Sequence, residues 1–144
     1  MGLTWGSGLL ARTVVFRDIR LGTTVEVLLS ADATRVVALE VRCGDGSHRF
    51  LPFGACEAAG GRLEVDSALV LMEGRFYADR GFRLGSLRGA AVRLEGKDVG
   101  AVSDVLVGPT GEVAALVLEA DGEEREVTRE GAELLVADAL RPAV

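Results

Sequence analysis

The 144-residue sequence predicts an all-β protein made of two tandem copies of one β meander. Apolar and polar residues alternate along several segments, turn-forming residues separate those segments at regular spacing, and the chain aligns with itself. Alternation buries one face of a strand, and short alternating strands joined by tight turns are typical of a β-sandwich or barrel.

The clearest strands are 24–29 and 37–43, where apolar residues recur at alternate positions. Turns are expected at 31–34, 44–47, 108–111 and 121–122, which are rich in Gly, Asp, Pro and Thr. Each copy is therefore predicted to contain a short strand, a turn, two long paired strands, a fourth strand, a short helical turn and a closing strand.

The self-alignment sets the boundaries of the copies. An offset of 78 places Leu9 on Leu87, Val14 on Val92, Gly22 on Gly100, Val27 on Val105 and Leu28 on Leu106. One deletion in the next turn changes the offset to 77, which places Val36 on Val113, Ala38 on Ala115 and Leu39 on Leu116. We therefore expect a first repeat at 1–71, a linker at 72–86 and a second repeat at 87–144.

The long strands are expected to be apolar on both faces. The inward face is predicted to carry Val37, Leu39, Val41 and Cys43, with Ala114, Leu116, Leu118 and Ala120 as counterparts. Leu28 and Leu106 fall on the other face. Because a small barrel buries only one face, the second face implies a further contact, with the other repeat as the first candidate and a homodimer as the next.

The linker supplies most of the candidate partner-contact residues, because it alternates Arg with aromatic residues. These candidates are Arg75, Phe76, Tyr77, Arg80, Phe82 and Arg83, together with Leu28 and Leu106. Arginine and aromatic side chains can stack on nucleic-acid bases, or they can pin the two repeats together with arginine stems over apolar surface. The packing role is favoured, because the stretch that follows is strongly acidic.

Charge argues against a nucleic-acid binder. The net charge is −6, and the acidic excess lies in 98–138, where eleven acidic residues face two basic ones. Residues 75–97 are the opposite, with six basic residues against two acidic ones. An acidic surface repels phosphate, so nucleic acid is an unfavourable partner.

Targeting signals are not expected in this chain. No segment reaches the roughly 20 apolar residues that span a bilayer, and the first residues do not resemble a signal peptide, so we expect a cytoplasmic protein without membrane insertion. The preference for Arg over Lys and the lack of Asn and Gln are typical of high-GC coding or of a thermophile, and thus of a bacterial or archaeal source.

The same composition narrows the enzyme classes, because His48 is the single histidine and Lys97 the single lysine. The spacing of Cys43, His48 and Cys56 lacks the close ligand pairs that zinc prefers, and His48 is expected in an exposed turn. The carboxylates between 123 and 133 are expected to be solvated, and residues 6–8 to be disordered or docked. No catalytic residue, metal site or cofactor is therefore expected.

One family resemblance covers much of the chain. Residues 84–122 resemble the PRC-barrel family through Gly89, Val92, Gly96, Gly100, the strand 102–107 with Asp104, Gly111, and the strand 113–118. The first half is similar more weakly, through Val14, Gly22, 26–29, 36–41 and the sequence Phe50-Leu51-Pro52-Phe53.

The resemblance implies two tandem small PRC-like β-barrels packed together and used as binding modules, with no catalytic residues to transfer. The expected function is a non-catalytic adaptor that binds another protein or a second copy of itself. An RNA-associated or ribosome-assembly accessory protein is the first alternative, and a small enzyme or ligand-binding barrel is the second.

Overall fold

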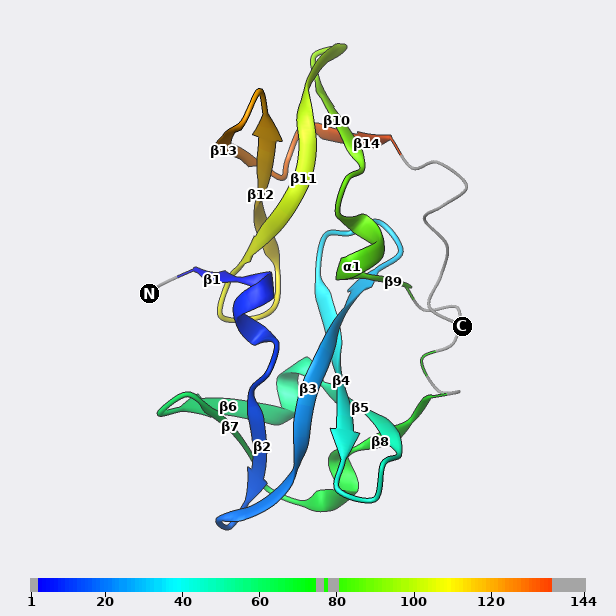
Figure 1. Cartoon of the computed structure of the whole chain (residues 1–144), viewed down its shortest axis with the longest axis vertical. Coiled ribbons are helices and arrows are strands. Elements are labelled where there is room, and N and C mark those ends of the chain that lie inside the picture. Colours follow the sequence, from blue (N-terminus) through cyan, green and yellow to red (C-terminus); the bar gives the residue numbers. More distant parts are fainter. Residues whose placement is uncertain (1–2, 75–76, 78–80, 136–144) are drawn as a thin grey trace.

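β-strands form most of the chain, as Figure 1 shows for this computed structural model, which describes residues 3–74, 77 and 81–135. The predicted all-β class is confirmed. The first half contains β1 (Thr4–Trp5), the 3₁₀ helix η1 (Gly6–Leu9), β2 (Thr13–Phe16), β3 (Ile19–Ser30), β4 (Val36–Cys43), β5 (His48–Pro52), η2 (Phe53–Ala55), β6 (Cys56–Ala59), β7 (Arg62–Val65), η3 (Ala68–Val70) and β8 (Met72–Glu73). The second half contains β9 (Gly81–Arg83), α1 (Leu84–Leu87), β10 (Ala91–Leu94), β11 (Lys97–Val107), β12 (Val113–Ala120), β13 (Glu123–Thr128) and β14 (Ala132–Leu135).

The strands form two sheets. The first has the order β6-β7-β2-β3-β4-β5-β8, and β9 also pairs with β3. The second has the order β13-β12-β11-β10-β14, and β1 also pairs with β11. Among the described residues neither order returns to its starting strand, so both are open sheets in this part of the chain.

The strand register of the two sheets agrees with the internal repeat. Val14 pairs with Gly22 in the first sheet, and Val92 pairs with Gly100 in the second, with a bulge following both pairs. The β3–β4 and β11–β12 ladders also correspond, because Leu28 faces Ala38 and Leu106 faces Ala115. The offsets of 78 and 77 therefore describe equivalent positions in space as well as in sequence.

The two repeats exchange their first strands. The offset of 78 makes β9 and α1 the counterparts of β1 and η1, yet β1 pairs with β11 and β9 pairs with β3. Trp5 lies opposite Leu106, and its counterpart Arg83 lies opposite Leu28. Each repeat therefore completes the sheet of the other. The last part of the predicted linker belongs to this exchange.

The exchange is fixed by η1, which docks on the second sheet. Asp104 accepts hydrogen bonds from the Ser7 backbone N–H at 3.0 Å and from the Ser7 hydroxyl. Residues 6–8 are thus ordered, and docking is the correct one of the two expectations for them. The β3–β4 and β11–β12 turns also meet, where Val36 N donates to Gly111 O at 2.7 Å and Val113 N donates to Thr34 O at 2.8 Å.

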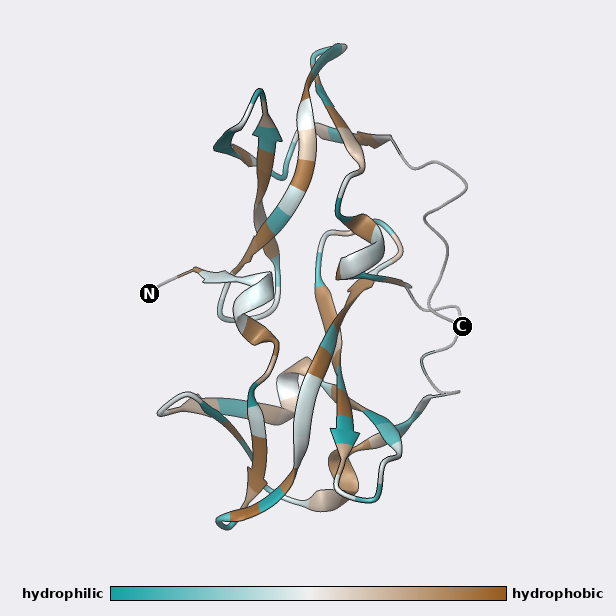
Figure 2. Ribbon diagram, viewed as in Figure 1, coloured by the Kyte–Doolittle hydropathy of each residue, from teal (hydrophilic) through white to brown (hydrophobic). Residues whose placement is uncertain are grey.

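A single hydrophobic core runs through both repeats. It includes Val14, Val27, Leu29, Leu39 and Leu51 from the first half and Val92, Val105, Leu116, Leu118 and Val127 from the second. Figure 2 shows apolar stretches along the central strands, whereas the end of the β12–β13 hairpin near its turn is hydrophilic.

One prediction about the inward face is wrong at the start of β4. Val36 lies in the main core, whereas Val37 is only partly buried and packs on the outer face. The reason is a bulge: Leu28 faces Ala38 and Leu29 faces Val36, so the alternation skips Val37. The same shift makes Val113 a core residue in the second repeat, while Ala114 is half-buried.

The predicted second apolar face exists on β3. Leu28, Ala38, Phe50 and Tyr77 form a separate buried cluster on the outer side of the first sheet. Leu28 and Ala38 are covered by the side chains of Phe50 on β5 and of Tyr77 from the joining segment, not mainly by the other repeat as expected. No helix among the described residues is long and apolar enough to cross a membrane.

Candidate functional site

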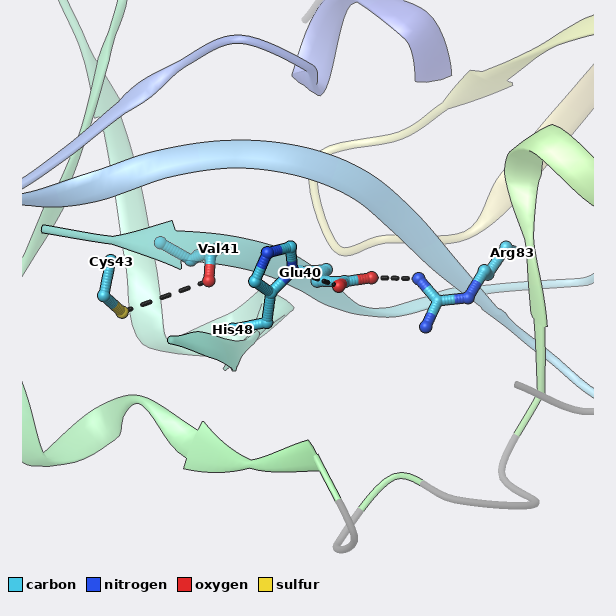
Figure 3. Close-up of polar contacts among 5 residues, drawn as sticks. All are labelled: Glu40, Val41, Cys43, His48 and Arg83. Atoms are coloured by element: carbon cyan, nitrogen blue, oxygen red, sulfur yellow. Dashed lines mark hydrogen bonds and ion pairs between the residues drawn. The ribbon is translucent and has the colours of Figure 1, made fainter. Parts of the chain in front are cut away.

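The most distinctive polar cluster lies on the outer side of the first sheet, where a buried carboxylate joins three strands (Figure 3). Glu40 on β4 is 8% exposed and forms an ion pair with Arg83 on β9. His48 at the start of β5 places its Nδ1 atom 2.7 Å from Glu40 Oε2. Because an ionised carboxylate only accepts hydrogen bonds, the histidine ring nitrogen is the donor.

The surroundings of Glu40 favour its ionised form. Burial is the largest single effect and raises the pKa of the carboxyl group, but the hydrogen bonds and charges of His48 and Arg83 together outweigh it. The pKa of Glu40 therefore lies below its ordinary value. We call the buried Glu40–Arg83 ion pair, together with its His48 partner, the clamp. It links the exchanged strand β9 to β4.

His48 has one feature of a catalytic base, since a carboxylate orients its ring and about half of its side chain is exposed. A nucleophile is missing from the arrangement. Cys43 packs against the main core, and Figure 3 shows it on β4 beyond Val41, whose carbonyl oxygen lies 4.0 Å from its Sγ atom. The prediction that His48 is exposed is confirmed, but its placement in a turn is wrong, because the histidine is the first residue of β5 and bonds to a buried group.

The second cysteine is also a packing residue. Cys56 is half-buried, its Sγ atom lies 3.5 Å from Phe53 O, and burial raises the pKa of its thiol. A thiol with a raised pKa is a poor nucleophile at neutral pH. Among the described residues, no three His, Cys, Asp or Glu side chains are grouped so that they could hold a metal ion.

The predicted contact residues separate into three groups. Tyr77 is buried and its ring centroid lies 5.3 Å from that of Phe50, directly in the cluster that covers Leu28. Phe82 is half-buried and lines a cavity of about 140 Å³ between the repeats, and Arg83 belongs to the Glu40 clamp. Arg75, Phe76 and Arg80 lie outside the described residues.

The second repeat presents different side chains at the equivalent positions. Trp5 stands where the first repeat has Arg83, and Val117 stands where it has Glu40. Leu106, the counterpart of Leu28, is 5% exposed, and Trp5 beside it is 43% exposed. The Glu40–Arg83 ion pair of the first repeat is thus replaced by two apolar side chains, Val117 and the exposed Trp5.

The outer strand differs as well. β5 pairs on its far side with β8, through Arg49 with Glu73 and Phe50 with Met72. Its counterpart β13 ends the order of the second sheet, and its far side has no strand partner among the described residues. Ala38 pairs with Pro52 in the first sheet, and its counterpart Ala115 pairs with Thr128 in the second, so Pro52 and Thr128 are equivalent. Two residues earlier in each strand, Phe50 corresponds to Glu126. Two residues earlier again, His48 corresponds to Glu124.

β13 forms an acidic edge, as its sequence suggested. Glu123, Glu124 and Glu126 are all exposed, and the outer face behind them is less covered than in the first repeat. Ala38 is fully buried beneath its neighbours, whereas its counterpart Ala115 is only half-buried. The predicted solvated carboxylates are therefore confirmed, and they also border a strand edge that has no strand partner among the described residues.

The sequence pattern did not indicate that Trp5 and Glu40 lie on the equivalent outer faces of the two sheets. A signal for both was present, because extending the offset of 78 to the start of the chain places Trp5 on Arg83, and the offset of 77 places Glu40 on Val117. Where the alignment places a charged residue of one repeat on an apolar residue of the other, the equivalent faces of the two repeats differ.

The chain matches no protein-family model and no curated protein.

Proposed function

We propose that this chain is a non-catalytic protein-binding module made of two PRC-barrel-like repeats, and that it holds a partner protein on the outer face of its second repeat. One observation carries the proposal: equivalent outer faces are covered differently. In the first repeat, β8 and Tyr77 cover β5 and Leu28. In the second repeat, the equivalent face borders Trp5 and the acidic edge of β13.

The exposed residues at β1 fit a contact surface. Trp5 is 43% exposed and Leu3 beside it is 49% exposed, whereas most large apolar side chains of the described residues are buried. Tryptophan contributes a large apolar area with one polar N–H group, and it is enriched among the residues that dominate binding energy at interfaces.

The alternatives fit this face less well. Nucleic acid is disfavoured because Glu123, Glu124 and Glu126 would face its phosphates. From the predicted basic linker, Arg83 is already paired with Glu40, and Tyr77 is buried. An enzyme would need a reactive group near His48, and Cys43 packs into the core instead.

The test uses the single tryptophan as a reporter. Peptide and small-domain libraries are selected on the immobilised full chain, and binders are then tested for a shift of the Trp5 emission. We expect selected binders to lose most of their affinity for a Trp5→Ala variant and to keep it for Leu69→Ala, a matched loss of an 89% exposed leucine elsewhere. Binders that ignore Trp5→Ala, or turnover of a small molecule by the full chain, would reject the proposal.

A further inference from the structure

The first repeat shows what covers the outer edge of its fourth strand. β8 adds to β5 as an antiparallel strand, and Met72 lies opposite Phe50. Tyr77 packs on Phe50, in the buried cluster that also contains Leu28 and Ala38. The edge of β5 is thus paired with a short extended segment, and an aromatic side chain a few residues later packs on the outer face of the sheet.

The same edge in the second repeat is ready to accept a strand. The β12–β13 hairpin turns through Asp121 and Gly122, whose φ angles are 54° and 80°, as a tight two-residue turn requires. From that turn, the antiparallel alternation directs the N–H groups of Glu124, Glu126 and Thr128 away from β12. In the first repeat, the equivalent N–H of Phe50 lies on the side that faces β8.

We propose that the outer edge of β13 binds an extended segment of a partner protein as an added antiparallel strand, with basic residues of that segment opposite Glu124 and Glu126 and a following aromatic residue over Ala115. This inference rests on the proposed function and names the kind of partner. It follows from the internal equivalence: β5 is covered by such a segment, and β13 differs from β5 mainly in carrying acidic residues on the outer face.

The acidic charge of the β13 edge determines which kind of strand can pair with it. Antiparallel pairing of β13 with a second copy of β13 places glutamates against glutamates, and like charges opposite each other destabilise a strand pair. Acidic side chains on an edge strand therefore prevent self-association and leave a basic strand as the favoured addition. Backbone hydrogen bonds supply affinity in this mode, and alternate side chains supply specificity.

The probes are two synthetic peptides that copy residues 69–78 of this chain. One carries Met72→Lys and Gly74→Lys, the positions that would face Glu126 and Glu124, and the other carries Met72→Glu and Gly74→Glu. Binding to the isotope-labelled full chain is followed by amide chemical shifts. Reversing two cross-strand charge pairs is expected to make the basic peptide bind about tenfold more tightly than the acidic one.

A charge exchange tests the site itself. Glu126→Lys leaves one acidic and one basic residue opposite the two probe positions and should abolish the preference between the two peptides, whereas Glu57→Lys, the same change at an exposed position on β6, should leave it unchanged. The largest shifts are expected at the amides of Glu124, Glu126 and Thr128. Because Glu126 is exposed on an edge strand, its replacement should leave the amide spectrum of the rest of the chain intact.

The outcomes separate this inference from the proposed function. Equal binding of the two peptides by the unchanged chain, an undiminished preference in Glu126→Lys, or cross-links that place residues 136–144 of the chain itself on β13 would overturn the added-strand inference. The module proposal stands if selected binders still depend on Trp5, and it fails if none does. Self-association of the free chain through β13 would also overturn the inference, because it requires the glutamates to tolerate each other.

Discussion

Replacing Glu40 by valine and Arg83 by tryptophan would give the first repeat the pair of side chains that the second repeat has at the same two positions, Val117 and Trp5. The equivalence of the two sheets makes this exchange a direct measure of the buried clamp. The two single variants each remove one partner of the Glu40–Arg83 ion pair, and the double variant removes both. Together with the wild type they form a double-mutant cycle.

The expected sizes follow from burial. The side chain of Glu40 is 10% exposed and that of Arg83 is 36% exposed. Arg83→Trp leaves a buried carboxylate with His48 alone and should cost about 2 kcal/mol of the free energy of unfolding, whereas Glu40→Val leaves an arginine that reaches water and should cost about 1 kcal/mol. The double variant should lie within about 1 kcal/mol of the wild type, because replacing both partners of a buried pair by well-packed apolar groups is often neutral.

Urea unfolding followed by far-ultraviolet circular dichroism gives these values, since the signal does not depend on the added tryptophan. The coupling energy, the sum of the two single costs less the cost of the double variant, should be about 2–4 kcal/mol. If the two single costs simply add in the double variant, Glu40 and Arg83 are not a coupled pair, and the clamp between β4 and β9 is refuted. A crystal structure of the double variant would show whether the introduced indole lies beside Leu28, as Trp5 lies beside Leu106.

The clamp also predicts a pH dependence. Because the pKa of Glu40 in the folded protein lies below its ordinary value of 4.5, its contribution to stability is fully present above that value and is lost as the pH falls through the lower, folded pKa. The wild type should therefore lose stability relative to the double variant below about pH 4.5. Parallel stability curves from pH 7 down to pH 3 would contradict this assignment.

Four further outcomes test the fold. Gly81→Ala should lower the unfolding free energy by about 2 kcal/mol or more, measured by thermal unfolding, because a Cβ atom there would overlap the carbonyl oxygen of Leu29 in the β3–β9 ladder. Leu84→Ala should cost about 2–5 kcal/mol because its side chain is fully buried, and Leu69→Ala should change stability by less than about 0.5 kcal/mol. Cys56 should react with iodoacetamide more slowly in the folded chain than in urea, because burial raises the pKa of its thiol, and equal rates would contradict its half-buried position.

Much of the fold could be predicted from local pattern. Turn residues at 44–47 and 121–122 lie in the loops β4–β5 and β12–β13, and Leu28 lies on the face opposite Leu29 as its parity required. These features depend on the two-residue period of a strand and on the backbone angles that Gly and Asp allow, and both are properties of short segments. The error at Val37 has the same origin, because a bulge between paired strands changes the parity without any residue that signals it.

The candidate site could be predicted only in part. The sequence pointed to the acidic residues of β13 and to Tyr77 and Arg83, but it could not show that Arg83 binds Glu40, 43 residues away. The roles of Trp5 and Ala115 depend on which segment lies over each sheet. That information is held in contacts between distant parts of the chain.

By itself, the sequence determined the all-β class, the two-fold repetition and the register of each repeat, because these arise from spacing within segments of about ten residues. Only the tertiary structure decided that β1 completes the second sheet and β9 the first. β1 and β9 occupy equivalent positions in the two repeats, and so do β11 and β3, the strands with which they pair. Local sequence preference therefore favours pairing within a repeat and pairing between repeats nearly equally. The distribution of side chains followed from that choice: Arg83 came to lie over Glu40, Trp5 came to lie beside Leu106, and the edge of β13 was left without a strand partner among the described residues.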